Sequence, residues 1–255
     1  MNALTRELHL FFNALTFFTR VPPPRWVHFS DQQLNHASRY FPLVGLLIGA
    51  VVALLCALLQ TILPLPVAVI VAIAAGVLLT GGFHEDGLAD VCDGFGGGWT
   101  AAQTLDIMKD SRLGSYGALG LLLVMALKLA ALLHVANLAA ALVVGHTLSR
   151  FVAVSLIRTE HYVRQDLLSK ARPLARRMGN AELGVAALPL LACLPLLPTM
   201  AWGLLLVTQL LLRVWLVRLF RRKIGGYTGD CLGAAQQLSE VSIYVVLCLP
   251  AAGLI

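Results

Sequence analysis

Charged residues are scarce in this chain: they make up 13% of its 255 residues, whereas 58% of the residues are hydrophobic. A soluble domain usually carries about 25% charged residues, and a disordered chain contains few apolar ones. The composition therefore argues against a water-soluble domain and against disorder. It is typical of a polytopic membrane protein.

Paired cysteines are also missing. Of the five cysteines, no two have the Cys-x-x-Cys spacing of a metal knuckle or a redox pair, and five are too few for a disulfide-stapled secreted domain. Cys56, Cys193 and Cys248 lie in apolar runs, so we expect them to act as small hydrophobic residues. The net charge of +6 is better explained by basic membrane-flanking loops than by a nucleic-acid partner, because no soluble basic domain is present.

Long apolar runs dominate what is present. A membrane-spanning helix needs about 20 mostly apolar residues. On this basis we expect about seven transmembrane helices, at 40–61, 65–83, 116–135, 138–157, 183–199, 201–220 and 241–255. The expected fold is all-α, with residues 1–255 forming a single membrane-embedded domain.

The distribution of charge predicts the orientation. All the acids and most Lys and Arg residues lie in the segments 1–39, 84–115, 158–182 and 221–240, and the intervening turns have none. Because basic loops stay on the cytoplasmic side, we expect the N-terminus and the three inserts to be cytoplasmic.

The N-terminal segment 1–39 is expected to lie at the membrane interface. Its apolar stretch of about ten residues is too short to span, and a proline run rather than a signal-peptide cleavage site follows it. We expect an interfacial helix that places four aromatic rings in the lipid, those of Phe11, Phe12, Phe17 and Phe18.

The acidic segment 81–98 is the most informative. Asp86, Asp90 and Asp93 are spaced i, i+4, i+7, which places them within an arc of about 60° on a helix. Like charges at this spacing destabilise a helix, and oxygen ligands without cysteine or clustered histidine favour Mg²⁺ or Mn²⁺. Glu85 lies off this stripe. The alternative is a solvated acidic face at a helix end.

A glycine-rich run, Gly94 to Gly98, follows the acids. Glycines such as Gly94 and Gly96 let backbone N–H groups approach phosphate oxygens, and the alternative is a flexible hinge. Beside the acids, the run favours a metal–diphosphate site.

Residues 100–103 resemble a capping box that opens a short helix ending near Gly114. Lys109 and Arg112 on this helix could neutralise phosphate oxygens, and Asp110 lies beside them. The alternative is a charged amphipathic helix on the membrane surface.

The last insert contains a second glycine-rich turn, with Asp230 at the start of a helix. The carboxylate could complete a metal shell or cap the helix, and the two interpretations are equally favoured. The basic insert 158–182 is expected to bind anionic lipid headgroups, with attraction of an anionic substrate as a secondary role.

Several basic residues lie inside predicted spans, where an ionisable group is costly unless it is paired or hydrated. The deepest are Lys128, Arg150 and Arg213. We predict that Arg150 and Arg213 point into a cavity open to the cytoplasm, which His146 and Ser149 also line.

Four blocks, in this order, resemble the membrane-bound cobalamin (5′-phosphate) synthases, the adenosylcobinamide-GDP ribazoletransferases. The blocks are residues 41–45, 81–94, 108–114 and 225–235. The similarity in length and span layout covers essentially the whole chain.

The resemblance implies a transferase that joins adenosylcobinamide-GDP to α-ribazole or its 5′-phosphate. The products are adenosylcobalamin, or its phosphate, and GMP, in the last assembly step of the coenzyme B12 nucleotide loop. The resemblance also implies Mg²⁺ and the bacterial cytoplasmic (inner) membrane. It does not decide between α-ribazole and its 5′-phosphate as the acceptor. A homo-oligomer and an association with other late B12-pathway enzymes are both possible partners.

The expected site combines the residue patterns with this chemistry. One or two Mg²⁺ ions are expected on four carboxylates, those of Asp86, Asp90, Asp93 and Asp230. Lys109 and Arg112 would stabilise the diphosphate, and Asp93 or Asp110 would accept the proton of the ribose hydroxyl. The cavity below Arg150 and Arg213 would hold part of the corrinoid or its phosphate.

Two other functions remain as alternatives. Residues 86–90 also resemble the opening of the CDP-alcohol phosphotransferase motif, but an Arg would be expected at Asp90 and the later acidic half of that motif is absent. A transporter would use the buried charges as a pathway across the membrane, yet the charged loops all lie on one predicted side of the membrane. A structural scaffold would not explain the acidic stripe.

Overall fold

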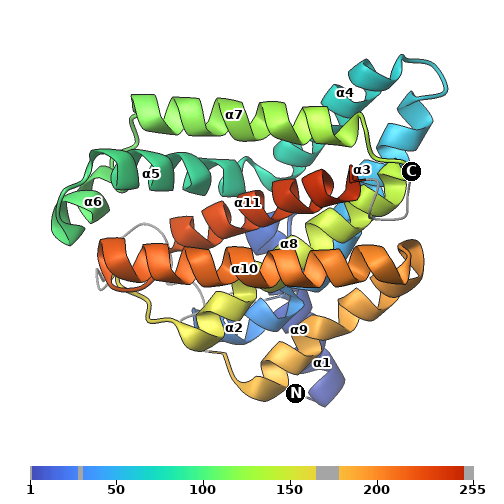
Figure 1. Cartoon of the computed structure of the whole chain (residues 1–255). Helices are drawn as coiled ribbons and strands as arrows, with labels where there is room; N and C mark the ends of the chain where they lie inside the picture. Colours follow the sequence, from blue (N-terminus) through green and yellow to red (C-terminus); the bar gives the residue numbers. More distant parts are fainter. Residues whose placement is uncertain (1, 28–30, 165–177, 250–255) are drawn as a thin grey trace.

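The computed structural model describes residues 2–27, 31–164 and 178–249, and most of these residues are helical (Figure 1). Within them the only β pairing is an isolated bridge between Tyr162 and Tyr227. The all-α prediction is therefore confirmed.

The helices vary widely in length. They are α1 (Ala3–Phe18), α2 (Asp31–Ala37), the 3₁₀ turn η1 (Ser38–Tyr40), α3 (Phe41–Leu59), α4 (Leu65–Thr80), α5 (Phe83–Gly97), α6 (Ala101–Ile107), α7 (Ser115–Leu132), α8 (Leu138–Thr159), α9 (Asn180–Cys193), the 3₁₀ turn η2 (Leu194–Leu196), α10 (Thr199–Ile224) and α11 (Gly229–Leu247).

Four helices of the described part are long and apolar enough to cross a membrane: α3 with the turn before it, α7, α8 and α10. The bent pair α4 and α5 adds a fifth if it is one span. Four or five of the seven predicted spans thus meet this criterion, and α9 is shorter than the segment 183–199. The predicted span 241–255 begins too late, because α11 starts at Gly229, and residues 250–255 lie outside the described part.

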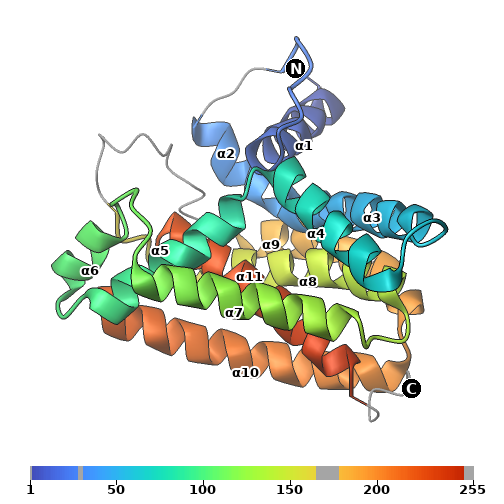
Figure 2. The same cartoon turned by 90° about the horizontal axis from the view of Figure 1, so that it is seen from above.

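The break between α4 and α5 was not predicted. The segment 65–83 was expected to be continuous, but Gly81 and Gly82 both adopt φ of 72°, which residues with a Cβ atom rarely adopt. The two helices consequently meet at 88°. As a result α5, expected in a cytoplasmic insert, packs along α7 and α11 inside the bundle (Figure 2).

Small residues bring the central helices close together. Gly45 and Gly49 of α3 face α8 so closely that a Cβ atom at either position would collide with the α8 backbone. Gly87 of α5 faces the backbone of Asp230 in α11 in the same way. Close backbone approach at small residues is the usual packing solution in membranes.

The described parts of the three predicted cytoplasmic inserts lie at one end of the bundle, whereas α1 and α2 of the N-terminal segment lie along its side (Figures 1 and 2). Both views show α5, α7, α8, α10 and α11 joined at that end, whereas the short turns near residues 64, 137 and 198 lie at the other end (Figures 1 and 2). This arrangement agrees with the prediction that long charged loops and short uncharged turns alternate between the two ends of the bundle.

The aromatic rings of α1 pack against protein. Phe18 is 5% exposed and its ring lies 4.3 Å from that of Phe41 and 5.1 Å from that of His84. Phe17 contacts Phe41 and Phe83. The prediction that these rings enter the lipid is therefore wrong for Phe18, because α3 and α5 cover it.

Candidate active site

The predicted acidic stripe lies on one helix and gains a fourth carboxylate from another. Asp86, Asp90 and Asp93 lie on α5, and Asp230 lies at the start of α11. A Cβ atom on Gly87 would lie 3.0 Å from the Cα and carbonyl oxygen of Asp230, so a larger residue would force the two helices apart by a few tenths of an ångström. Asp230, Asp86 and Asp93 all repel the Asp90 carboxylate electrostatically.

Two of these carboxylates have unused oxygens. Asp86 is exposed and Asp90 is half-buried, and neither side chain hydrogen-bonds or ion-pairs with another described residue. Within the described ranges, no three His, Cys, Asp or Glu side chains converge as a ready-made metal site. Asp86 and Asp90 are therefore available to a cation whose remaining oxygen ligands come from another molecule.

Asp93 has a structural partner that the sequence did not reveal. Its two carboxylate oxygens accept the backbone N–H groups of Gly114, at 2.7 Å, and of Gly117, at 2.8 Å. These groups belong to the first turn of α7, whose N–H groups have no partner within the helix. Asp93 thus caps α7, and each oxygen keeps a lone pair for a further ligand.

Asp230 is held by a cation rather than acting as a cap. The cap of α11 is Thr228, whose Oγ1 accepts the Cys231 N–H at 3.3 Å. Arg164 places its Nη2 2.7 Å from Oδ2 of Asp230 and donates to the carbonyl of Met108 at 3.2 Å. Of the two interpretations of Asp230, capping is therefore excluded. Residues 165–177 of the basic insert lie outside the described part.

The turn after α6 carries the other predicted phosphate-binding residues. Thr100 caps α6 as predicted, but the helix ends at Ile107 rather than near Gly114. Arg112 ion-pairs with Asp110 at 2.6 Å in an exposed turn that also contains Lys109. The hydrogen bonds from Arg112 lower the pKa of the Asp110 carboxyl, which makes it a weaker base.

The two candidate glycines lie inside α5 instead of in a loop. A Cβ atom on Gly94 would collide with Met108, and one on Gly96 would collide with the Tyr116 ring. Both glycines therefore have a packing reason to lack a side chain. Their role in phosphate binding stays a prediction.

The two predicted cavity arginines have different surroundings. Arg213 donates to Ser155 Oγ at 2.7 Å and Thr159 Oγ1 at 2.6 Å, and it is not among the residues that line the two cavities described below. Its predicted place in a cavity open to the cytoplasm stays a prediction. Arg150 is 2% exposed and lines both cavities, whereas the predicted opening toward the cytoplasm stays a prediction.

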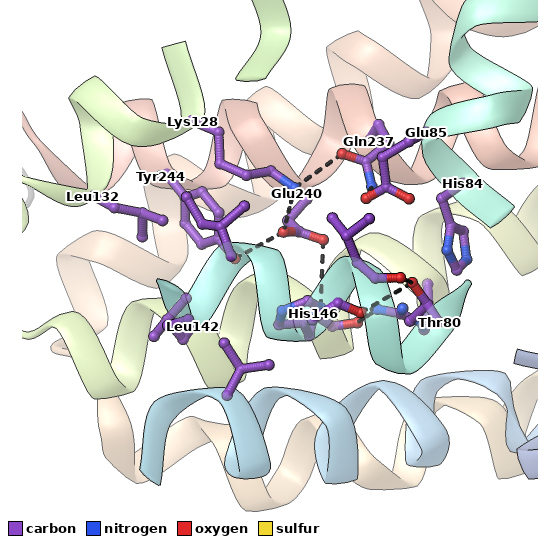
Figure 3. A pocket seen from close by; sticks show the side chains of 16 residues that line it. Thr80, His84, Glu85, Lys128, Leu132, Leu142, His146, Gln237, Glu240 and Tyr244 are labelled. Atoms are coloured by element: carbon purple, nitrogen blue, oxygen red, sulfur yellow. Dashed lines mark hydrogen bonds and ion pairs between the residues drawn. The ribbon is translucent and has the colours of Figure 1, made fainter. Parts of the chain in front are cut away.

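A buried polar network surrounds the larger cavity (Figure 3). Lys128 Nζ lies 2.9 Å from Glu240 Oε1 and donates to Gln237 Oε1 at 2.9 Å. Gln237 in turn donates to Glu85 Oε1 at 3.0 Å. The network gives the deep Lys128 an ion-pair partner and connects α5 to α7 and α11. The sequence did not predict the contacts of Glu85 and Gln237, because these two residues lie far apart in the chain.

Comparisons with known proteins agree with this geometry. Residues 10–248 match the family model described as cobalamin-5-phosphate synthase. The chain is 53% identical to the adenosylcobinamide-GDP ribazoletransferase of Shewanella frigidimarina over 95% of each chain. It is 51% identical to the protein of that name from Shewanella oneidensis, over 95% of this chain and 94% of the relative.

No solved structure matches the chain. The family model nevertheless covers nearly the full length, including every carboxylate of the α5–α11 crossing. The chain therefore belongs to the cobalamin-5-phosphate synthase family.

Proposed function

We propose that this protein joins adenosylcobinamide-GDP to α-ribazole or its 5′-phosphate, forming adenosylcobalamin or its phosphate and releasing GMP. The names of relatives about half identical over nearly the whole chain support the substrates. The α5–α11 crossing supports the chemistry, because it gathers Asp86, Asp90 and Asp230 beside one another.

The donor set fits Mg²⁺. Mg²⁺ in phosphate-transfer sites is usually held by one or two carboxylates together with substrate phosphates, and Asp86 and Asp90 offer hard oxygens that repel each other. In the proposal these two residues hold the ion, with Asp230 and the remaining lone pairs of Asp93 beside them. When bound, the metal supplies Lewis-acid stabilisation of charge on the departing phosphate.

The chain's own residues complete the proposed chemistry. Arg164 lies at Asp230, and Lys109 and Arg112 lie in the neighbouring loop. These cations would bind the anionic diphosphate. Asp93 and Asp110 both stay proposed proton acceptors, since each carboxylate already accepts hydrogen bonds, Asp93 from the N–H groups of Gly114 and Gly117 and Asp110 from Arg112.

The reaction is proposed to occur on the cytoplasmic side of the inner membrane. Asp230 lies at the start of α11, at the end of the bundle where α10 finishes in Arg221, Arg222 and Lys223 (Figure 2). Basic loops are retained in the cytoplasm, so the site would open to the compartment that contains nucleotides.

Turnover by the purified protein in liposomes tests the proposal. Adenosylcobinamide-GDP and α-ribazole 5′-phosphate should give GMP and a new corrinoid, and EDTA should abolish both. Asp86→Asn and Asp90→Asn should lose turnover while inserting normally, whereas the matched change Asp106→Asn on α6 should retain it. Full activity in both α5 variants would refute the metal assignment, and turnover only with a CDP-linked donor would refute the substrate.

A further inference from the structure

A second cavity lies next to the carboxylates and has no role in the chemistry described so far. We name it the aromatic cavity. Its lining residues are Phe18, Phe41, Phe83, His84, Arg150, Ala153, Val154, Leu232, Gly233 and Gln236. It is bordered by α1, α3, α5, α8 and α11, and its space of about 310 Å³ includes the part that is open to solvent.

The aromatic cavity adjoins the candidate active site along two helices. Phe83 precedes Asp86 by three residues on α5, and Gly233 follows Asp230 by three residues on α11. Residues three apart share a helix face and are separated by about 4.5 Å along the axis. A molecule in the cavity would therefore lie about one helical turn from the carboxylates.

The walls of the aromatic cavity suit a flat, largely apolar ring. The Phe18 ring stacks on that of His84 at 5.1 Å with an angle of 15° between their planes. The Phe41 ring stands edge-on to Phe18, and Phe83, 36% exposed, completes the aromatic wall. Aromatic rings pack favourably against other rings in stacked or edge-to-face geometry.

One polar group of the cavity wall has an unused donor. Arg150 is 2% exposed, and its Nε–H has no acceptor among the described residues. Its Nη1 hydrogen-bonds to His146 of the same helix, and its Cζ lies 5.9 Å from the centre of the Phe18 ring. A buried donor without an acceptor costs about 1–3 kcal/mol. Arg150 is therefore poised to donate to a ligand atom.

We propose that the aromatic cavity binds the benzimidazole base of α-ribazole, with the ribose directed toward Asp86 and Asp230. This proposal rests on the proposed function. The base is a flat, neutral bicycle with one free ring nitrogen, which would accept the Arg150 Nε–H. The phenylalanine rings would cover its faces.

The other substrate fits this cavity less well. Guanine carries N–H donors that need acceptors, whereas the unused polar atom in this wall is a donor. A corrin macrocycle with its amide side chains is too large for about 310 Å³. The donor substrate is therefore assigned to the open side of the carboxylates.

Ligand binding to the detergent-purified full chain tests the assignment without requiring turnover. The probes are α-ribazole and the indole riboside of the same shape, which lacks the ring nitrogen acceptor. We expect the wild type to bind α-ribazole at least tenfold more tightly than the indole riboside. Arg150→Met should bind the two ribosides equally, because the donor is gone.

Steady-state kinetics provide the second measurement. Phe83→Ala should raise KM for α-ribazole at least fivefold and leave KM for adenosylcobinamide-GDP unchanged. The matched change Phe12→Ala, on a ring of α1 that contacts Trp26 away from the cavity, should change neither. Monodisperse elution and an unchanged Tm establish that each variant is folded.

Equal binding of the two ribosides by the wild type would overturn the proposal, and so would a rise in KM for the corrinoid alone. Failure of the proposed function would look different. No turnover would occur with either acceptor, while the binding comparison would still decide whether the cavity prefers a base with a ring acceptor.

Discussion

Replacing Lys128 by methionine would remove the positive charge from the ion pair with Glu240 at the centre of the bundle. Both side chains are almost completely buried, with 5% and 2% of their surfaces exposed, and Nζ lies 2.9 Å from Oε1. Methionine keeps most of the side-chain volume. The variant therefore tests the charge rather than the packing.

The size of the effect follows from the distance and the surviving partners of Glu240. At an effective dielectric constant of about 20, two unit charges 2.9 Å apart interact by about 6 kcal/mol. Glu240 keeps the Tyr244 hydroxyl at 3.0 Å and the Gln236 amide, which reduce the net loss. We expect Lys128→Met to lower the unfolding free energy by about 3 kcal/mol, at the lower end of values for broken buried pairs.

Removing both charges should restore most of the stability. In the double variant Lys128→Met, Glu240→Gln, the uncompensated Glu240 charge is gone, while buried Arg150 loses a nearby carboxylate. Its unfolding free energy should therefore recover about 2 kcal/mol of the loss. The measurement is reversible unfolding in mixed detergent micelles. Arg218→Met, an exposed cation on α10, is the control and should change little. A double variant no more stable than the single one would refute the reasoning.

Three further predictions concern the site. Asp93→Ala should lower the unfolding free energy by about 1 kcal/mol because it uncaps α7, whereas Asp86→Asn should leave it unchanged; equal thermal stability of Asp93→Ala and the wild type would contradict the cap. Gly87→Ala places a Cβ atom 3.0 Å from the backbone of Asp230 and should reduce both turnover and Tm, while Gly203→Ala, with open space around it, should be neutral. EDTA should abolish GMP release and excess Mg²⁺ should restore it, and release that resists the chelator would argue against the metal.

The acidic stripe was predictable because helical periodicity is local. The spacing of Asp86, Asp90 and Asp93 alone is enough to place three side chains on one face. The break at Gly81 and Gly82 was missed for a related reason. The apolar run reaches Phe83, just past the two glycines, and only the left-handed backbone of these glycines reveals the turn.

Long-range partners could not be predicted from spacing. Nothing in the sequence around Asp93 indicates that it reaches the N–H groups of α7, and nothing around Arg164 indicates that it pairs with Asp230. The last span was misplaced because hydropathy assigns polar residues to loops. In α11, Gln236 and Glu240 are buried, since Ser149 of α8 and Lys128 of α7 supply partners from other helices.

The crossing of α5 and α11 also affects the order in which the protein can be made. Asp86 and Asp230 are about 144 residues apart, so at about 5–20 residues per second the ribosome completes α11 roughly 7 to 30 seconds after α5. During this interval Glu85 lacks the Gln237 amide and the acidic helix has no partner across the crossing. Until α11 is made, the polar helix α5 therefore lacks its packing partner in the nascent protein. A chain truncated before α11 would leave α5 accessible to quality-control proteases.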